Sequence, residues 1–272
     1  MPEFPEIKRK LRGGGTLDKK GDILGKIKNG VIVSCQALEN EPLYGSDTMV
    51  KMAVGALMGG AKGIRSNSVE DIKTIKQNVD LPIIGIIKRE YEGSDCYITA
   101  TMKEVDELVE QAKPHIVAVD GTKRRHPDGT TGEEFVAAVR KKYPDILLMA
   151  DISTLEEAVS AEKAGVDLVS TTLSGYTPYS PQIEGPDFEL MSLCSRELSI
   201  PVIAEGRIWC PEEANAAFMT GVSAIVVGTA ITRPREITRR FVERISGKDV
   251  KCYIPSCPKL CDDKDGAVTQ SR

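Results

Sequence analysis

Two side chains that can exchange protons stand at the ends of apolar segments of this chain. Lys88 follows the apolar run 82–87, and Glu205 follows the run 201–204. A lysine in a cleft of low dielectric has a lowered pKa and can act as a base near neutral pH, whereas a buried carboxylate has a raised pKa. The pair therefore predicts proton transfer on either face of one carbon. The alternative is a buried Lys88–Glu205 ion pair with only a structural role.

Most of the other apolar segments also end in a residue that could bind a ligand. These ends are Gln36, Arg65, Asp120, Asp151, Thr171-Thr172 and Gly228-Thr229. Polar residues mark where any strand leaves a core, and that explains some of these positions. It explains poorly why a polar residue so regularly stands at the C-terminal end of the apolar segment.

The elements that must position these residues alternate between strand-like and helix-like patterns. Apolar segments end about every 27 residues, which suits one strand, one helix and two short loops. Capping residues followed by Glu, or Pro at a first helical position, open a helix between successive segments. The expected strands are 31–36, 61–66, 82–88, 115–120, 146–151, 167–171, 201–205 and 223–228. The expected helices begin near Ser46, Ser68, Thr99, Thr130, Ser153, Pro186, Cys210 and Arg233.

Eight alternating units predict an α/β fold, a single (β/α)8 TIM barrel, over residues 30–246. Residues 1–29 are interpreted as a flexible leader with a short N-terminal helix near residues 22–28. Residues 247–272 are interpreted as a disordered tail that carries Cys252, Cys257 and Cys261.

The barrel places every strand end listed above at one mouth, because active sites in this fold lie at the carboxyl ends of the strands. Lys88 on the third strand and Glu205 on the seventh should face each other across that mouth. The glycine-bearing ends of strands seven and eight predict a phosphate site at Gly206, Arg207, Gly228 and Thr229. The hydroxyl-rich loop 170–180, which includes Thr177, is expected to cover the site.

Composition excludes several classes of partner. The formal net charge is −4 with acids and bases scattered, which argues against a nucleic-acid or membrane surface. No apolar run approaches the roughly 20 residues of a membrane span, and the N-terminus has no apolar signal region, so a cytoplasmic location is expected. Neither the cysteines nor His115 and His126 make a recognisable metal or nucleophile motif, and no metal is expected.

Several of these segments together resemble the N-acetylmannosamine-6-phosphate 2-epimerases of bacterial sialic-acid catabolism. The similar stretches span about residues 30–245 and include 32–38, 63–65, 82–89, 148–157, 169–180, 202–208 and 230–234. The sequence departs from the family pattern at Gly228-Thr229-Ala230, where Gly-Gly-Ala is usual, at Asp120-Gly121-Thr122 and at Trp209-Cys210.

The resemblance implies interconversion of N-acetylmannosamine 6-phosphate and N-acetylglucosamine 6-phosphate through a C2 proton shift on the opened sugar, with no organic cofactor or metal. It implies that Lys88 and Glu205 are catalytic. The substrate-binding residues are expected to be Gln36, Arg65, Asp120, Asp151, Thr177 and Arg207, with phosphate at Gly206, Arg207, Gly228 and Thr229.

Two other functions stay open from the sequence. Lys88 could instead form a Schiff base in an aldolase or lyase acting on a phosphorylated sugar. The chain could also be a non-catalytic sensor of a sugar phosphate. The oligomeric state is open, with a homo-oligomer among the options.

Overall fold

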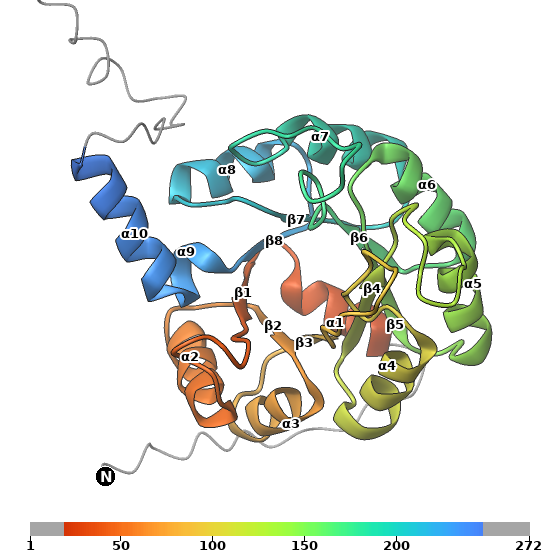
Figure 1. Ribbon diagram of the computed structural model, residues 1–272, viewed down its shortest axis with the longest axis horizontal. Helices are drawn as coiled ribbons and strands as arrows, with labels where there is room; N and C mark the ends of the chain where they lie inside the picture. Colours follow the sequence, from red (N-terminus) through yellow and green to blue (C-terminus); the bar gives the residue numbers. More distant parts are fainter. Residues whose placement is uncertain (1–18, 247–272) are drawn as a thin grey trace, which may run out of the picture.

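Eight parallel strands close into a barrel, as the spacing of the apolar segments predicts. The computed structural model describes residues 19–246. The strands follow chain order around the sheet, and β1 pairs with both β2 and β8 (Figure 1). They are β1 Val31–Cys35, β2 Gly63–Asn67, β3 Ile83–Ile86, β4 Ile116–Asp120, β5 Leu147–Asp151, β6 Leu168–Ser170, β7 Val202–Glu205 and β8 Ala224–Val227. The predicted (β/α)8 barrel is confirmed.

Helix α1 precedes β1, and the other helices follow the strands and surround the barrel (Figure 1). They are α1 Lys19–Ile27, α2 Ser46–Met58, α3 Val69–Asn78, α4 Met102–Asp106 with the π-helical segment η1 Glu107–Ala112, α5 Gly132–Lys142, α6 Leu155–Ala164, α7 Phe188–Glu197, α8 Pro211–Met219, α9 Thr229–Thr232 and α10 Pro234–Ile245. The sequence did not predict the short helix α9.

Helix starts are set by local capping. At α6 the Thr154 hydroxyl accepts the backbone N–H of Glu157, and the Glu157 carboxylate accepts the N–H of Thr154. The same reciprocal capping box opens α4 at Thr101 and α5 at Thr131. The predicted starts of these three helices lie one or two residues too early, because the capping threonine is the one three residues before a glutamate. The predicted starts at Ser68, Cys210 and Arg233 coincide with the observed N-caps.

The period of two along each strand divides the apolar side chains between two layers. Ile32, Ile84, Met149 and Ile203 belong to the inner cluster of the barrel, whereas their strand neighbours pack against the surrounding helices. Ile27 of α1 joins the inner cluster, and Figure 1 shows α1 lying over the barrel axis. One end of the barrel is thus closed by α1, which leaves the carboxyl ends of the strands for a site.

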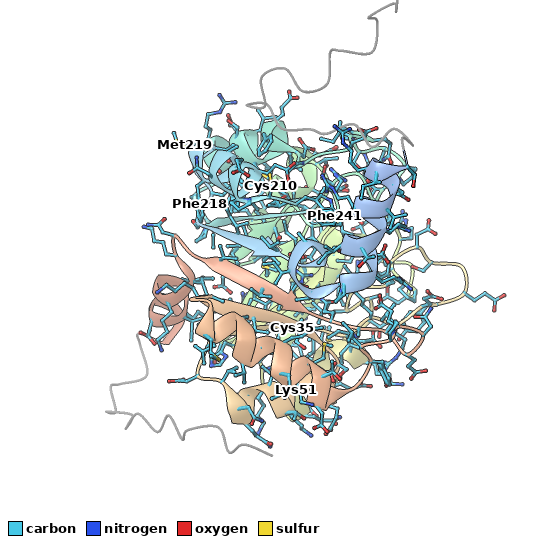
Figure 2. All side chains as sticks on the ribbon, turned by 90° about the vertical axis from the view of Figure 1, so that its left-hand side faces the viewer. Cys35, Lys51, Cys210, Phe218, Met219 and Phe241 are labelled. Carbon is cyan, nitrogen blue, oxygen red and sulfur yellow. The ribbon has the colours of Figure 1, made fainter. Side chains whose placement is uncertain are left out.

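Helix α10 differs from the other long helices because it has no buried residue. It projects from the rim of the barrel in Figure 1, and Phe241 is labelled on it in Figure 2. Phe241 is 67% exposed, Val242 56% and Ile245 85%. Exposed apolar side chains that lie together are common where proteins contact other molecules.

No helix among residues 19–246 combines the length and the apolar character that crossing a membrane requires. The predicted domain boundaries stay a prediction. Residues 1–18 and 247–272, with the three cysteines of the predicted tail, lie outside the described residues.

Candidate active site

The same period of two that builds the inner core also aims the charged side chains into the barrel mouth. Lys88 is two residues beyond Ile86, Asp151 two beyond Met149, and Glu205 two beyond Ile203, and each of these apolar residues lies in the inner cluster. Side chains two apart along a strand share a face. The core pattern of each strand therefore dictates which polar side chain enters the mouth.

A cavity of about 510 Å³ opens at this end of the barrel. Volumes of this size are typical of small-molecule sites. Predicted site residues make up much of its lining: Gln36, Arg65, Lys88, Glu205, Gly206, Arg207, Gly228 and Thr229. With Thr172 from the end of β6, side chains and backbone from six of the eight strand ends thus meet around one space.

Arg65 is a buried cation held between two carboxylates. It is 1% exposed, and its Nη1 lies 3.0 Å from Asp151 Oδ1 and 2.9 Å from Glu205 Oε2, while Nη2 lies 2.5 Å from Asp151 Oδ2. Burial alone would lower the pKa of the guanidinium, but Asp151 and Glu205 raise it overall. Arg65 therefore keeps a fixed positive charge at the floor of the cavity.

Glu205 combines burial with a polar neighbourhood. Its Oε2 lies 3.1 Å from the Thr172 hydroxyl and 3.4 Å from the Ser170 hydroxyl, in addition to the contact with Arg65. Burial raises the pKa of Glu205, and the Arg65 charge opposes that effect. A carboxyl group under two such opposed influences can exist in both protonation states.

Lys88 has a firmly held backbone, and its amine has no ion-pair partner among the described residues. Its N–H donates to Asn67 Oδ1 at 2.7 Å, and the residue pairs with Ile98 in an isolated bridge. None of the ion pairs found within residues 19–246 includes its Nζ. Burial, followed by the charges of Arg65 and Arg233, lowers the pKa of Lys88 to about 8.

Gln36 presents an unused acceptor at the cavity. Its Nε2 donates to the Ser34 hydroxyl at 2.8 Å, whereas its buried Oε1 has no donor among the residues that the structure describes. A buried carbonyl without a partner is costly. A ligand with an N–H or O–H group would satisfy it.

Arg207 lines the cavity, but it holds a loop. It has a left-handed backbone (φ 56°) after Gly206 (φ 116°). Its Nε donates to the carbonyl of Gly185 at 2.7 Å, and Nη1 donates to that of Ser174 at 2.6 Å. Arg207 therefore fastens both ends of the loop between β6 and α7 over the site. Arg233, just beyond α9, also lines the cavity and pairs with Glu41 at 3.2 Å.

Three residues predicted to bind substrate do not line the cavity. Asp151 lies behind Arg65. Asp120 is fully buried and pairs with Arg124 at 2.5 Å. Thr177 is 1% exposed and donates to the Ser153 hydroxyl at 2.9 Å. As direct binding groups these three are poorly placed, because other side chains and backbone separate them from the cavity.

Several lining residues were not predicted as site residues, among them Tyr97, Tyr176, Glu184 and Trp209. They come from loops, whose path depends on tertiary contacts. Tyr97 enters the site because segment 97–99 returns to pair with segment 87–89, with Arg89 N 3.0 Å from Tyr97 O. Arg240 of α10 stacks over Trp209 at 4.5 Å. The unusual Trp209 was visible in the sequence, but its stacking was not.

Fold and site together define a (β/α)8-barrel protein with a charged small-molecule cavity built around a lysine, an arginine and a carboxylate. The family model described as "Putative N-acetylmannosamine-6-phosphate epimerase" (NanE) matches residues 49–247. The chain belongs to this family.

Curated relatives cover most of the chain. A protein of Caldanaerobacter subterraneus subsp. tengcongensis named "Putative N-acetylmannosamine-6-phosphate 2-epimerase" is 59% identical over 221 residues, which are 81% of this chain and 93% of the relative. A protein of the same name from Shouchella clausii is 52% identical over 225 residues, which are 82% of this chain and 98% of that one.

Solved structures agree in fold. The N-acetylmannosamine-6-phosphate 2-epimerase from Clostridium perfringens is 48% identical with a TM-score of 0.78, and the match covers 87% of this chain and all of that one (100%). The thiamine phosphate pyrophosphorylase from Pyrococcus furiosus is 21% identical with a TM-score of 0.54, over 82% of this chain and 99% of that one. The latter likeness concerns the fold alone.

Proposed function

We propose that this protein interconverts N-acetylmannosamine 6-phosphate and N-acetylglucosamine 6-phosphate, a step of sialic-acid catabolism. The observation that carries the proposal is the Lys88 amine, with its lowered pKa, in the same cavity as the Arg65–Glu205 pair. Family membership supports the substrate, since the relatives described above carry the name of this activity.

The chemistry is removal and return of the proton on C2 of the open-chain sugar. The aldehyde at C1 acidifies the C2–H bond, and an unprotonated Lys88 amine takes that proton as a general base. Charge then develops on the C1 oxygen as an enolate forms. The Arg65 guanidinium, fixed by Asp151 and Glu205, is a preorganised positive charge that stabilises this oxygen.

Epimerisation requires a proton to return to the opposite face of C2. β3 and β7 lie four places apart in the closed ring, so Lys88 and Glu205 approach the cavity from opposite sides. Glu205, whose pKa is raised by burial, is suited to give a proton on the face away from Lys88. The contact with Arg65 opposes protonation of Glu205. The assignment of Lys88 as the base and Glu205 as the acid is part of the proposal.

The phosphate is proposed to bind at the ends of β7 and β8. Gly206, Gly228 and Thr229 bring backbone close to the cavity there, and the Arg233 guanidinium lies on the same lining. Gly206 needs its positive φ of 116°, which a residue with a side chain adopts only under strain. Neither an organic cofactor nor a catalytic metal is part of the proposed mechanism.

Partners beyond the phosphorylated amino sugar stay proposals. We propose a cytoplasmic protein that binds neither nucleic acid nor membrane, in keeping with its scattered charges. We also propose a homo-oligomer, supported by the exposed apolar residues of α10.

One alternative draws on the same observation. An unpaired amine whose pKa is lowered to about 8 also suits attack on a carbonyl, so Lys88 could form a Schiff base in an aldolase or lyase. Reduction with borohydride in the presence of the sugar phosphate separates the two. A covalent adduct on Lys88 would support the lyase.

The decisive test follows N-acetylmannosamine 6-phosphate in deuterium oxide by proton NMR. We expect N-acetylglucosamine 6-phosphate to appear and deuterium to accumulate at C2 of both epimers. Tight binding without exchange would contradict the proposal and would indicate a sensor of sugar phosphates.

A further inference from the structure

A second cluster of reactive side chains lies beside the active site, between the ends of β3 and β4. It consists of Cys96, Asp120 and His126, all buried, with one candidate ligand atom from each lying within 4.8 Å of the other two. Cys96 precedes Tyr97 in the segment after β3, Asp120 ends β4, and His126 lies in the loop before α5. None of the chemistry proposed for the sugar uses this cluster.

The imidazole of His126 is oriented as metal-binding histidines are. Its Nδ1 lies 2.8 Å from the carbonyl oxygen of Ala100, which can only accept, so Nδ1 carries the proton. The lone pair is then on Nε2, the ring nitrogen that remains able to bind a ligand. A backbone carbonyl that fixes the tautomer in this way is the usual support of a histidine ligand.

Nε2 of His126 has no hydrogen-bond donor among residues 19–246, although the side chain is only 2% exposed. The ring is held in place by stacking on Phe135, with centroids 4.3 Å apart. A buried acceptor without a donor destabilises the folded protein. The unpaired Nε2 is explained if it binds a metal ion.

We propose that Cys96, Asp120 and His126 bind a divalent transition-metal ion of the Zn²⁺ type as a structural site. Thiolate, imidazole and carboxylate are the three side-chain ligands that zinc uses. Zinc lies about 2.3 Å from sulfur and about 2.0 Å from nitrogen, so binding draws the three side chains closer together. A further oxygen donor completes four-coordination.

The surroundings of Asp120 fit this assignment. A thiolate at Cys96 and the Asp120 carboxylate supply two negative charges to a divalent cation, and Arg124, which pairs with Asp120, offsets one of them. Asp120 Oδ1 accepts from the N–H and the hydroxyl of Thr122 at 2.9 and 2.7 Å, and Oδ2 accepts from Arg124 at 2.5 Å. A carboxylate has about four lone-pair positions, and the fourth position of Asp120 accepts from the Cys96 thiol, whose proton the metal would replace. Hydrogen bonds such as those from Thr122 and Arg124 orient ligating carboxylates.

The ion would stiffen the segment that holds the proposed base. Tyr97 O accepts from Arg89 N at 3.0 Å, Thr99 N donates to Ile87 O at 2.7 Å, and Asp120 N donates to Ile98 O at 3.0 Å. Tying Cys96 to Asp120 and His126 therefore fixes segment 96–99 between Lys88 and β4. The ion lies outside the cavity and takes no part in the proposed proton transfer.

Cobalt(II) is the probe, because a thiolate bound to it gives a charge-transfer absorption in the near ultraviolet. The background is the full chain with Cys252, Cys257 and Cys261 all changed to Ser, so that thiols elsewhere do not contribute. We expect this protein to bind one cobalt ion with that absorption, and Zn²⁺ to displace it. Cys96→Ser should abolish the band, His126→Ala should weaken cobalt binding at least tenfold, and Cys194→Ser, at a buried cysteine of α7, should leave both unchanged.

X-ray absorption of the zinc-loaded background protein needs no variant in the cluster and so does not depend on how those variants fold. We expect one sulfur and otherwise nitrogen or oxygen ligands around zinc. A first shell without sulfur, a cobalt band that survives Cys96→Ser, or no metal bound to the background protein would each overturn the proposal.

Discussion

At the scale of single residues, the site depends on how one lysine is kept apart from the carboxylates around it. Arg65 forms ion pairs with both Asp151 and Glu205, at distances of 2.5 to 3.0 Å. Lys88 is left with the repulsion of two arginines and with desolvation, and both lower its pKa. An ion pair between Lys88 and Glu205, the structural alternative from the sequence, is not among the contacts of the described residues.

The first prediction concerns pH. The base Lys88 must be unprotonated, and its pKa is lowered to about 8, so kcat/KM should fall about tenfold per pH unit below that value. Above that value kcat/KM should stop rising, and it should decline once Glu205 has lost the proton that it gives. Initial rates of epimerisation between pH 6 and 9.5 test this. A profile that is flat from pH 6 to 8.5, or that still rises steeply toward the pKa of an ordinary lysine, would contradict the role of Lys88.

The second prediction concerns the support of Arg65. Asp151→Asn leaves a buried guanidinium with one carboxylate in place of two, so we expect a loss of roughly 3 kcal/mol in the free energy of unfolding and a lower kcat. Urea unfolding with matched rate measurements tests it. Asp106→Asn is the control, since Asp106 pairs with Lys142 at the surface (33% and 45% exposed) and should cost at most about 1 kcal/mol. Equal losses in the two variants would be inconsistent with a central role for the Arg65 network.

Among the residues, the sequence predicted those that continue a strand's inner face. Lys88, Glu205, Arg65 and Gln36 all reach the cavity lining. Asp151 was found by the same pattern, yet it acts through Arg65, because the inward direction of a side chain does not say whether another side chain covers it.

At the scale of elements, the strands orient the charged side chains into the cavity, and the loops cover it. The loop between β6 and α7 is fastened by Arg207 at Ser174 and Gly185. Arg207 was predicted to bind the substrate itself, but its Nε and Nη1 donate hydrogen bonds to the loop. The sequence could not predict this, since the partners are backbone carbonyls, which any residue provides.

The third prediction tests that fastening. A Cβ at Gly175 would lie 1.9 Å from Arg207 Nη1, so Gly175→Ala should displace the guanidinium, loosen the loop and raise KM roughly tenfold, about 1.4 kcal/mol. Gly129→Ala is the matched control: its φ of 85° resembles the 78° of Gly175, but no atom lies within 4 Å of the added Cβ. Both variants therefore place alanine at a strained positive φ, whereas only Gly175→Ala collides with Arg207. An unchanged KM for Gly175→Ala would refute the loop's role in binding.

The alternation of strand and helix was predictable for a physical reason. A strand buried on both faces and a capped amphipathic helix each have a local signature, and the closed parallel barrel satisfies eight such pairs. Helix α9 and the return of segment 97–99 toward Lys88 lack such a signature, because tertiary contacts determine them.

At the scale of the whole molecule, α10 links the exterior to the site. Arg240 stacks on Trp209, which lines the cavity, whereas Phe241, Val242 and Ile245 remain exposed. This division was not predicted from the sequence, from which only a helix beginning near Arg233 was expected.

The fourth prediction is that these apolar residues mediate self-association. Phe241→Asp combined with Val242→Asp places two charges on the contact surface and should lower the molar mass measured by light scattering to that of one chain. Ile183→Asp, at a residue 41% exposed in the loop after β6, should leave the mass of the oligomer unchanged. A single-chain mass for the unaltered protein would rule out the homo-oligomer.

The central claim is that the Lys88 amine removes the proton from C2, and one measurement addresses it directly: C2 deuterium exchange in deuterium oxide, by NMR, for Lys88→Ala beside the unaltered protein. We predict a loss of exchange of roughly 10²- to 10⁴-fold, the usual worth of a general base, with binding of inorganic phosphate largely kept. Exchange at the unaltered rate in Lys88→Ala would contradict the account.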